Sequence, residues 1–233
     1  MDTMKIKYEF FFKDGRTEVI ELSLDAIDLS LEPLLTEVDE PWTKLDFHQC
    51  QDCPLDPAKH ALCPVARNLS SILLRFRDDV SFAPVVTRVT TNERTTEKRG
   101  TLEIGVSALM GLIMATSGCP ILDRFKPMAF THLPFANENE TMFRAVSTYL
   151  TAQFIRMTKG KAPDWGLEKL EAMYGKITRI NSAFSERVRE LKGKDANISA
   201  LVVLDVFAQF GSFTLTDNWV EKVESFFSAY LDE

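Results

Sequence analysis

Glycine is scarce in this sequence, and an excess of positive charge is absent. Only 10 of the 233 residues are glycine, and none lies in a cluster that could cradle a phosphate. No Walker A loop, dinucleotide fingerprint, nucleophile elbow or His-Glu-x-x-His zinc motif occurs. The formal net charge of -7 argues against binding to nucleic acid or to an anionic membrane. Nucleotide binding and the common hydrolase chemistries therefore lack support.

Long apolar runs are also missing. The longest runs from about Ile104 to Ala115, and at about twelve residues it falls short of the roughly twenty that span a bilayer. The first residues contain no apolar stretch typical of a secretory signal. We therefore expect a cytoplasmic protein, in a reducing compartment where thiols are not consumed by structural disulfides.

Alternating apolar residues near the start predict a β-hairpin. Residues 5–12 and 19–24 carry apolar side chains at every second position, and Asp14-Gly15 between them suits a tight turn. Residues 80–91 are rich in β-branched side chains and predict a strand. We interpret the charged stretch 92–99 as a turn, at the tip of a second hairpin.

Helical periodicity dominates the rest of the chain. We expect helices at 64–76, 101–116, 139–159, 167–192, 195–210 and 216–231. Pro64 suits a first helical position, which puts Cys63 at or beside the N-cap. The helix at 195–210 is apolar nearly all round, so we expect it to lie in the centre of the fold.

These patterns together predict an α+β fold. We expect a single domain, 1–233, in which a β-rich part (1–100) is packed with a helical bundle (101–233). Within the first part, the stretch 48–64 contains three of the four cysteines and is irregular. A long irregular segment in a compact chain is usually functional, disordered, or held in place by a bound group such as a metal ion.

The four cysteines form the most informative pattern. Three are followed by proline, in the sequences Cys50-Gln-Asp-Cys53-Pro54, Cys63-Pro64 and Cys119-Pro120. Four thiolates complete a closed tetrahedral shell around a soft or borderline metal. We therefore predict a metal site made of Cys50, Cys53, Cys63 and Cys119. The last of these must return across 55 residues to join the others.

The identity of the metal stays open. A proline after cysteine lacks the backbone N–H that often donates a hydrogen bond to zinc-bound sulfur, which counts against zinc. The bacterial ferredoxin motif ends in Cys-Pro, and this similarity favours an iron–sulfur cluster. The ferredoxin spacing is absent, however, and structural zinc fits four thiolates equally well. Free buried cysteines and a Cys50–Cys53 redox pair are the remaining alternatives.

Other polar residues extend the list of candidates. Imidazole can replace a thiolate, so His48, His60 and His132 are possible substitute ligands. Asp205 lies in the apolar helix, four residues before Gln209. It could be a tuned acid or base, although a polar stripe or a buried ion pair is the simpler interpretation.

Three functional hypotheses follow. The first is a metal-binding protein, structural or electron-transferring, to which no substrate chemistry is assigned. The second is a helical interaction or regulatory module with incidental cysteines, acting as a homo-oligomer or with a protein partner. The third is an enzyme with a helical pocket around Asp205 or His132.

The chain also resembles a known family. The resemblance rests on Asp14-Gly15, Ser117-Gly118-Cys119-Pro120, His132-Leu133-Pro134-Phe135, and Asp195-Ala196-Asn197 leading into Leu204-Asp205. It covers most of the chain and points to an uncharacterised bacterial family, a domain of unknown function. The resemblance implies a bacterial cytoplasmic setting, and it supplies no activity, substrate or cofactor.

Overall fold

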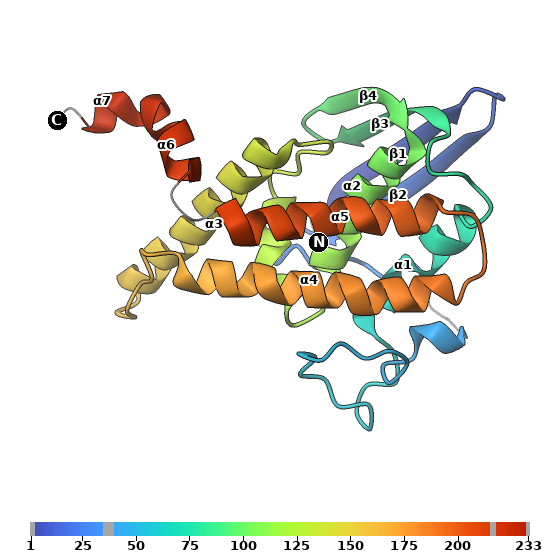
Figure 1. Cartoon of the computed structure of the whole chain (residues 1–233), viewed down its shortest axis with the longest axis horizontal. Helices are drawn as coiled ribbons and strands as arrows, with labels where there is room; N and C mark the ends of the chain where they lie inside the picture. Colours follow the sequence, from blue (N-terminus) through green and yellow to red (C-terminus); the bar gives the residue numbers. More distant parts are fainter. Residues whose placement is uncertain (1–2, 35–39, 215–217, 232–233) are drawn as a thin grey trace.

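An antiparallel sheet and a set of helices build this α+β protein (Figure 1). The computed structural model describes residues 3–34, 40–214 and 218–231. The sheet has the strand order β2-β1-β3-β4. Its strands are β1 (Thr3–Phe12), β2 (Thr17–Asp25), β3 (Pro84–Thr91) and β4 (Thr95–Thr101). The predicted fold class is confirmed.

The first hairpin forms as its alternation predicts. Ile6, Tyr8 and Phe10 of β1 are completely buried, while the residues between them are partly exposed. Ile6 pairs with Leu22 of β2, so the apolar positions of both strands share one face. Gly15 has a φ of 90° in the turn, where a side chain would be strained.

The second hairpin corrects the sequence interpretation. The predicted charged turn at 92–99 is a turn only at its start, because β4 begins at Thr95 and pairs with β3. The strand was missed because Glu97, Lys98 and Arg99 give it no apolar alternation. Charge is common on an edge strand, where it discourages pairing with other chains.

Helices α1 (Pro64–Arg75) and α2 (Leu102–Thr116) pack on the buried face of the sheet. α2 approaches the sheet closely at Gly105, where an added Cβ would lie 2.5 Å from Oγ1 of Thr87 and 2.7 Å from a ring carbon of Phe10. Only glycine permits this spacing. The main core therefore joins the sheet to α1, α2 and the facing sides of α4 and α5.

The remaining helices extend the fold away from the sheet. They are α3 (Glu138–Thr158), α4 (Glu168–Arg189), α5 (Ala196–Thr214), α6 (Asn218–Glu224) and α7 (Ser228–Leu231), with 3-10 turns η1 (Pro41–Thr43), η2 (Leu122–Ala129) and η3 (Ser225–Phe227). A second buried cluster joins α3, α4 and α6 through Met142, Tyr149, Met173 and Trp219. None of the helices in the described part of the chain is long and apolar enough to cross a membrane.

Two helix predictions need correction. α5 lies against α2 and α4, but it is not buried all round, because Val202 and Val206 are about half exposed. The single helix expected at 216–231 is instead α6, η3 and α7, and residues 216–217 lie outside the described part. Figure 1 shows α6 and α7 beyond the end of α5, where few neighbours stabilise a long helix.

Candidate functional site

Three of the cysteines lie where the chain turns from the sheet into α1. The backbone N–H of Cys53 donates to the carbonyl of Cys50 at 3.0 Å, so these two residues form one turn. Cys63 is the N-cap of α1 and Pro64 its first residue, as predicted. The N–H of Cys63 donates to the carbonyl of Thr43 at 2.8 Å. Figure 1 shows this segment as an irregular lobe beside α1 and α4.

Cys119 follows the end of α2, after Gly118, whose φ of 84° turns the chain. Burial raises the pKa of Cys119, and the backbone N–H groups of Leu122 and Ile121 oppose part of that rise. The sulfur of Cys119 therefore lies in a largely apolar environment that includes two backbone N–H dipoles.

The four thiols influence one another without forming a compact cluster. Burial, with smaller contributions from the thiols of Cys63, Cys119 and Cys53, raises the pKa of Cys50 to about 12. Cys50, Cys53 and Cys119 all pack against the core cluster that contains Cys63. Among the described residues, however, no three His, Cys, Asp or Glu side chains are placed to hold one metal ion. The four cysteines form no disulfide, and the described residues show no metal site around them.

Arg187 of α4 places a buried cation beside these thiols. Its side chain is 1% exposed and donates to the carbonyls of Trp42 at 2.7 Å, Lys44 at 2.6 Å and Leu45 at 3.0 Å. Its charge also lowers the pKa of Cys50, against the effect of burial. No carboxylate of the described residues forms an ion pair with it.

A second bond ties the same segment to α4, because Arg179 forms an ion pair with Asp52, between Cys50 and Cys53. Sequence reasoning missed Arg187. The available signal was its position on the apolar stripe of α4, between Phe184 and Val188, where a charged side chain is unusual.

The three histidines have different surroundings. His48 and His60 are exposed, and the ring of His48 packs edge-on against Phe47. Nε2 of His132 shares a hydrogen bond of 2.6 Å with the hydroxyl of Tyr8. Burial, and secondarily the charge of Arg144, lower the pKa of His132 to about 4. Its ring is therefore neutral at physiological pH.

Asp205 of α5 forms hydrogen bonds with two neighbouring amide side chains. Its carboxylate accepts a hydrogen bond of 2.7 Å from the amide of Gln209 and a longer one, 3.5 Å, from Asn181. It does not line the cavity described next, whereas His132 does.

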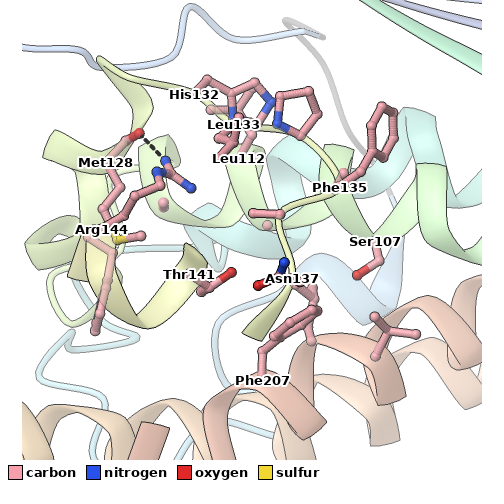
Figure 2. A pocket seen from close by; sticks show the side chains of 18 of the residues that line it. Ser107, Leu112, Met128, His132, Leu133, Phe135, Asn137, Thr141, Arg144 and Phe207 are labelled. Atoms are coloured by element: carbon pink, nitrogen blue, oxygen red, sulfur yellow. Dashed lines mark hydrogen bonds between the residues drawn. The ribbon is translucent and has the colours of Figure 1, made fainter. Parts of the chain in front are cut away.

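A cavity of about 420 Å³ lies between α2, α5 and the start of α3. Figure 2 shows side chains from these helices and from the segment before α3 around it. Most of the lining is apolar, and Ala108, Gly111 and Ala115 leave room along α2. Sequence reasoning missed the cavity. The spacing of these small residues was the available signal.

The polar part of the cavity includes Arg144, Tyr174 and His132. Nη2 of Arg144 donates to the carbonyl of Met128 at 2.7 Å, as the dashed line in Figure 2 marks. Its Nε is buried and has no hydrogen-bond partner among the described residues. Burial lowers the pKa of Arg144 and raises that of Tyr174.

Comparisons with known proteins identify a family. Residues 6–228 match the model of a domain of unknown function, DUF6901. Searches of the curated proteins and of the solved structures gave no match. The resemblance seen in the sequence to a domain of unknown function is thus confirmed. Because the match spans nearly the whole sequence, the chain belongs to the DUF6901 family.

Proposed function

We propose that the protein binds a metal centre through Cys50, Cys53, Cys63 and Cys119, and that this centre is an iron–sulfur cluster. The observation that carries the proposal is that Cys63 belongs to the main hydrophobic core and that Cys50, Cys53 and Cys119 pack against that same core, although Cys119 is remote in sequence. Four soft thiolates suit iron–sulfur clusters or zinc.

A single zinc ion makes a stricter demand on the spacing of its ligands than a cluster does. With Zn–S bonds of about 2.3 Å, tetrahedral geometry puts the sulfurs about 3.8 Å apart. No three of the described thiols, imidazoles and carboxylates are placed in that way. A cluster carries its thiolates on different iron atoms, so it accepts sulfurs that stand further apart. Structural zinc, which would need the thiols to draw together, is the alternative.

Electrostatics supports an anionic centre at this position. Thiolates on a cluster add negative charge, which is costly to bury without compensation. The guanidinium of Arg187 supplies a buried positive charge, and the N-terminus of α1 starts at Cys63. The backbone N–H groups of Leu122 and Ile121, which lower the pKa of Cys119 against the larger effect of burial, could likewise stabilise a coordinated sulfur. When bound, the cluster would supply one-electron transfer or hold the irregular segment in place.

The test is purification without oxygen. We expect a brown protein with absorbance near 400 nm, and iron and acid-labile sulfide bound in equal amounts. Serine at Cys50, Cys63 or Cys119 should each remove the colour, whereas His60→Ala, an exposed change nearby, should not. A colourless protein with one zinc ion would establish the alternative. No metal after anaerobic reconstitution, with Cys119→Ser folding normally, would refute both. A cytoplasmic setting, as expected from the sequence, would keep the thiols reduced.

An interaction module is the second candidate, because one end of α3 leaves large apolar side chains exposed. Phe154, Ile155 and Met157 are 55%, 47% and 45% exposed. Exposed apolar groups of this size often mark a contact with another chain. Sedimentation of the purified protein would test self-association. If Phe154→Ser does not alter the mass distribution, this end of α3 is not a self-association surface.

A further inference from the structure

The cavity between α2, α3 and α5 is not used by the proposed metal centre, since none of the four cysteines lines it. Its volume of about 420 Å³ is within the range of small-molecule sites, about 300 to 1,000 Å³. The body of the cavity is formed by alkyl and aromatic groups, among them Ala108, Leu112, Val203 and Phe207. A ligand must therefore be apolar over most of its length.

Among the described residues, the charged side chains of the cavity wall are Arg144 and Lys98, and no Asp or Glu lines it. Its other titratable groups are neutral, because burial lowers the pKa of His132 and raises that of Tyr174. An apolar ligand that also carries one negative charge would complement this wall.

Arg144 has a free donor for such a ligand. One of its nitrogens is bonded to Met128, but its Nε is buried without a partner among the described residues. A buried donor without a partner is unfavourable, and an anionic acceptor would remove that penalty. Glu140, one turn earlier on α3, already accepts from the N–H of Asn137 at 2.8 Å in the helix cap.

Tyr174 and Thr141 lie on the same wall as Arg144. Their hydroxyls can add neutral hydrogen bonds to an anionic head group. The planar guanidinium matches the two oxygens of a carboxylate, whereas a doubly charged phosphate needs more donors than one arginine gives.

We propose that this cavity binds an amphipathic monocarboxylate, with its carboxylate at Arg144 and its hydrocarbon body between α2 and α5. The proposal is independent of the metal centre, and ligand binding to the cavity can be measured whether or not metal is bound. A saturated chain of about twelve carbons is a suitable probe for a cavity of this size.

The experiment is calorimetric titration of the full chain with dodecanoate below its micellar concentration. Dodecanol and dodecyltrimethylammonium have the same chain but a neutral or a positive head. We expect one dodecanoate to bind per chain and dodecyltrimethylammonium not to bind. The affinity for dodecanol should be at least about ten-fold lower than that for dodecanoate, because dodecanol lacks the charge-assisted contact with Arg144.

Two substitutions separate the parts of the site. Arg144→Gln should weaken dodecanoate at least about ten-fold and leave dodecanol unchanged. Ala108→Phe should abolish both, because its ring would fill the cavity. Arg156→Gln is the matched control: Arg156 lies on the same helix, outside this cavity, and donates to the carbonyl of Ala162. It should have no effect.

Two results would overturn the proposal. One is equal affinity for dodecanoate and dodecanol. The other is binding of several dodecanoates that Ala108→Phe does not change, which would indicate a detergent-like surface effect. If circular dichroism shows that Arg144→Gln does not fold, Arg144→Lys is the second variant, because it keeps the positive charge but lacks the planar guanidinium. It should retain the preference for dodecanoate over dodecanol, and loss of that preference would also refute the site.

Discussion

The hydroxyl of Tyr8, in the middle of the sheet, shares a hydrogen bond of 2.6 Å with His132, which lies 124 residues later beside the cavity. Tyr8 is completely buried, and burial raises its pKa, so the hydroxyl is neutral. This bond fixes the segment before α3 to the sheet. It therefore ties one wall of the cavity to the sheet.

Removal of that hydroxyl should weaken the fold. Tyr8→Phe leaves Nε2 of His132 without its partner, which should lower the free energy of unfolding by about 1–3 kcal/mol. Chemical denaturation of the variant and the parent measures the difference. Phe10→Leu, also in β1, is the comparison for a purely apolar change. An unaltered midpoint in Tyr8→Phe would mean that the bond contributes nothing.

His132 should make stability depend on pH. Its folded pKa of about 4 lies below the ordinary 6.5, so the unfolded chain binds a proton more readily between these values. Stability from this group is complete above pH 6.5 and falls as the pH drops towards 4, by at most about 3 kcal/mol. His132→Gln should flatten this part of the stability profile. Identical profiles for the variant and the parent would contradict the assignment.

Arg187 should be essential to the cysteine segment. Arg187→Met removes its donors to the carbonyls of Trp42, Lys44 and Leu45, and should destabilise the fold by at least about 3 kcal/mol. If a cluster is bound, its retention should also fall. Arg189→Met, an exposed change two residues later, is the control. Thermal unfolding and iron content measure the two effects separately.

The thiols of metal-free protein should react slowly. Burial and the neighbouring thiols raise the pKa of Cys50 to about 12, so at pH 8 its thiolate is rarer than in an ordinary cysteine. We expect alkylation by iodoacetamide to be about a thousand-fold slower in the folded than in the unfolded chain. Mass spectrometry of peptides containing Cys50 gives the rate. Rapid labelling of the folded chain would show that the thiol is not buried.

Gly105 should not tolerate a side chain. Gly105→Ala places a Cβ against Thr87 and Phe10, and overpacking of this kind costs about 1–3 kcal/mol. Gly175→Ala, inside α4, is the matched control, because its added Cβ would lie 3.9 Å from Nη1 of Arg179, an ordinary contact distance. That change should be neutral or stabilise by up to about 1 kcal/mol. Equal effects of the two substitutions would mean that α2 does not pack so closely on the sheet.

Local patterns predicted most of the elements, because periodicity reports which face of a strand or helix is buried. The hairpin around Gly15 and the helix that begins at Pro64 are examples. β4 escaped detection because an edge strand needs no apolar alternation. The exposed side of α5 was missed because Val202 and Val206 are apolar, and only the arrangement of neighbouring helices decides whether they are covered.

The candidate site residues likewise fall into those that the sequence identifies and those that only the folded structure identifies. The four cysteines could be named from their residue type and spacing, and the proposed centre rests on them. The roles of Arg187 and Arg144 could not, since each depends on which carbonyls and helices surround it after folding. The cavity likewise arises from the distance between α2 and α5, which no single segment encodes.

Because β1 lies between β2 and β3 in the sheet, its two partner strands are synthesised at different times. β2 follows β1 within a few residues, but β3 begins about 70 residues after β1 ends. At a ribosomal rate of about 5–20 residues per second, one edge of β1 waits about 4–14 s for its partner. During that interval its apolar residues Ile6, Tyr8 and Phe10 can pair with another chain. Slowing translation between β2 and β3 should therefore increase aggregation of the nascent protein.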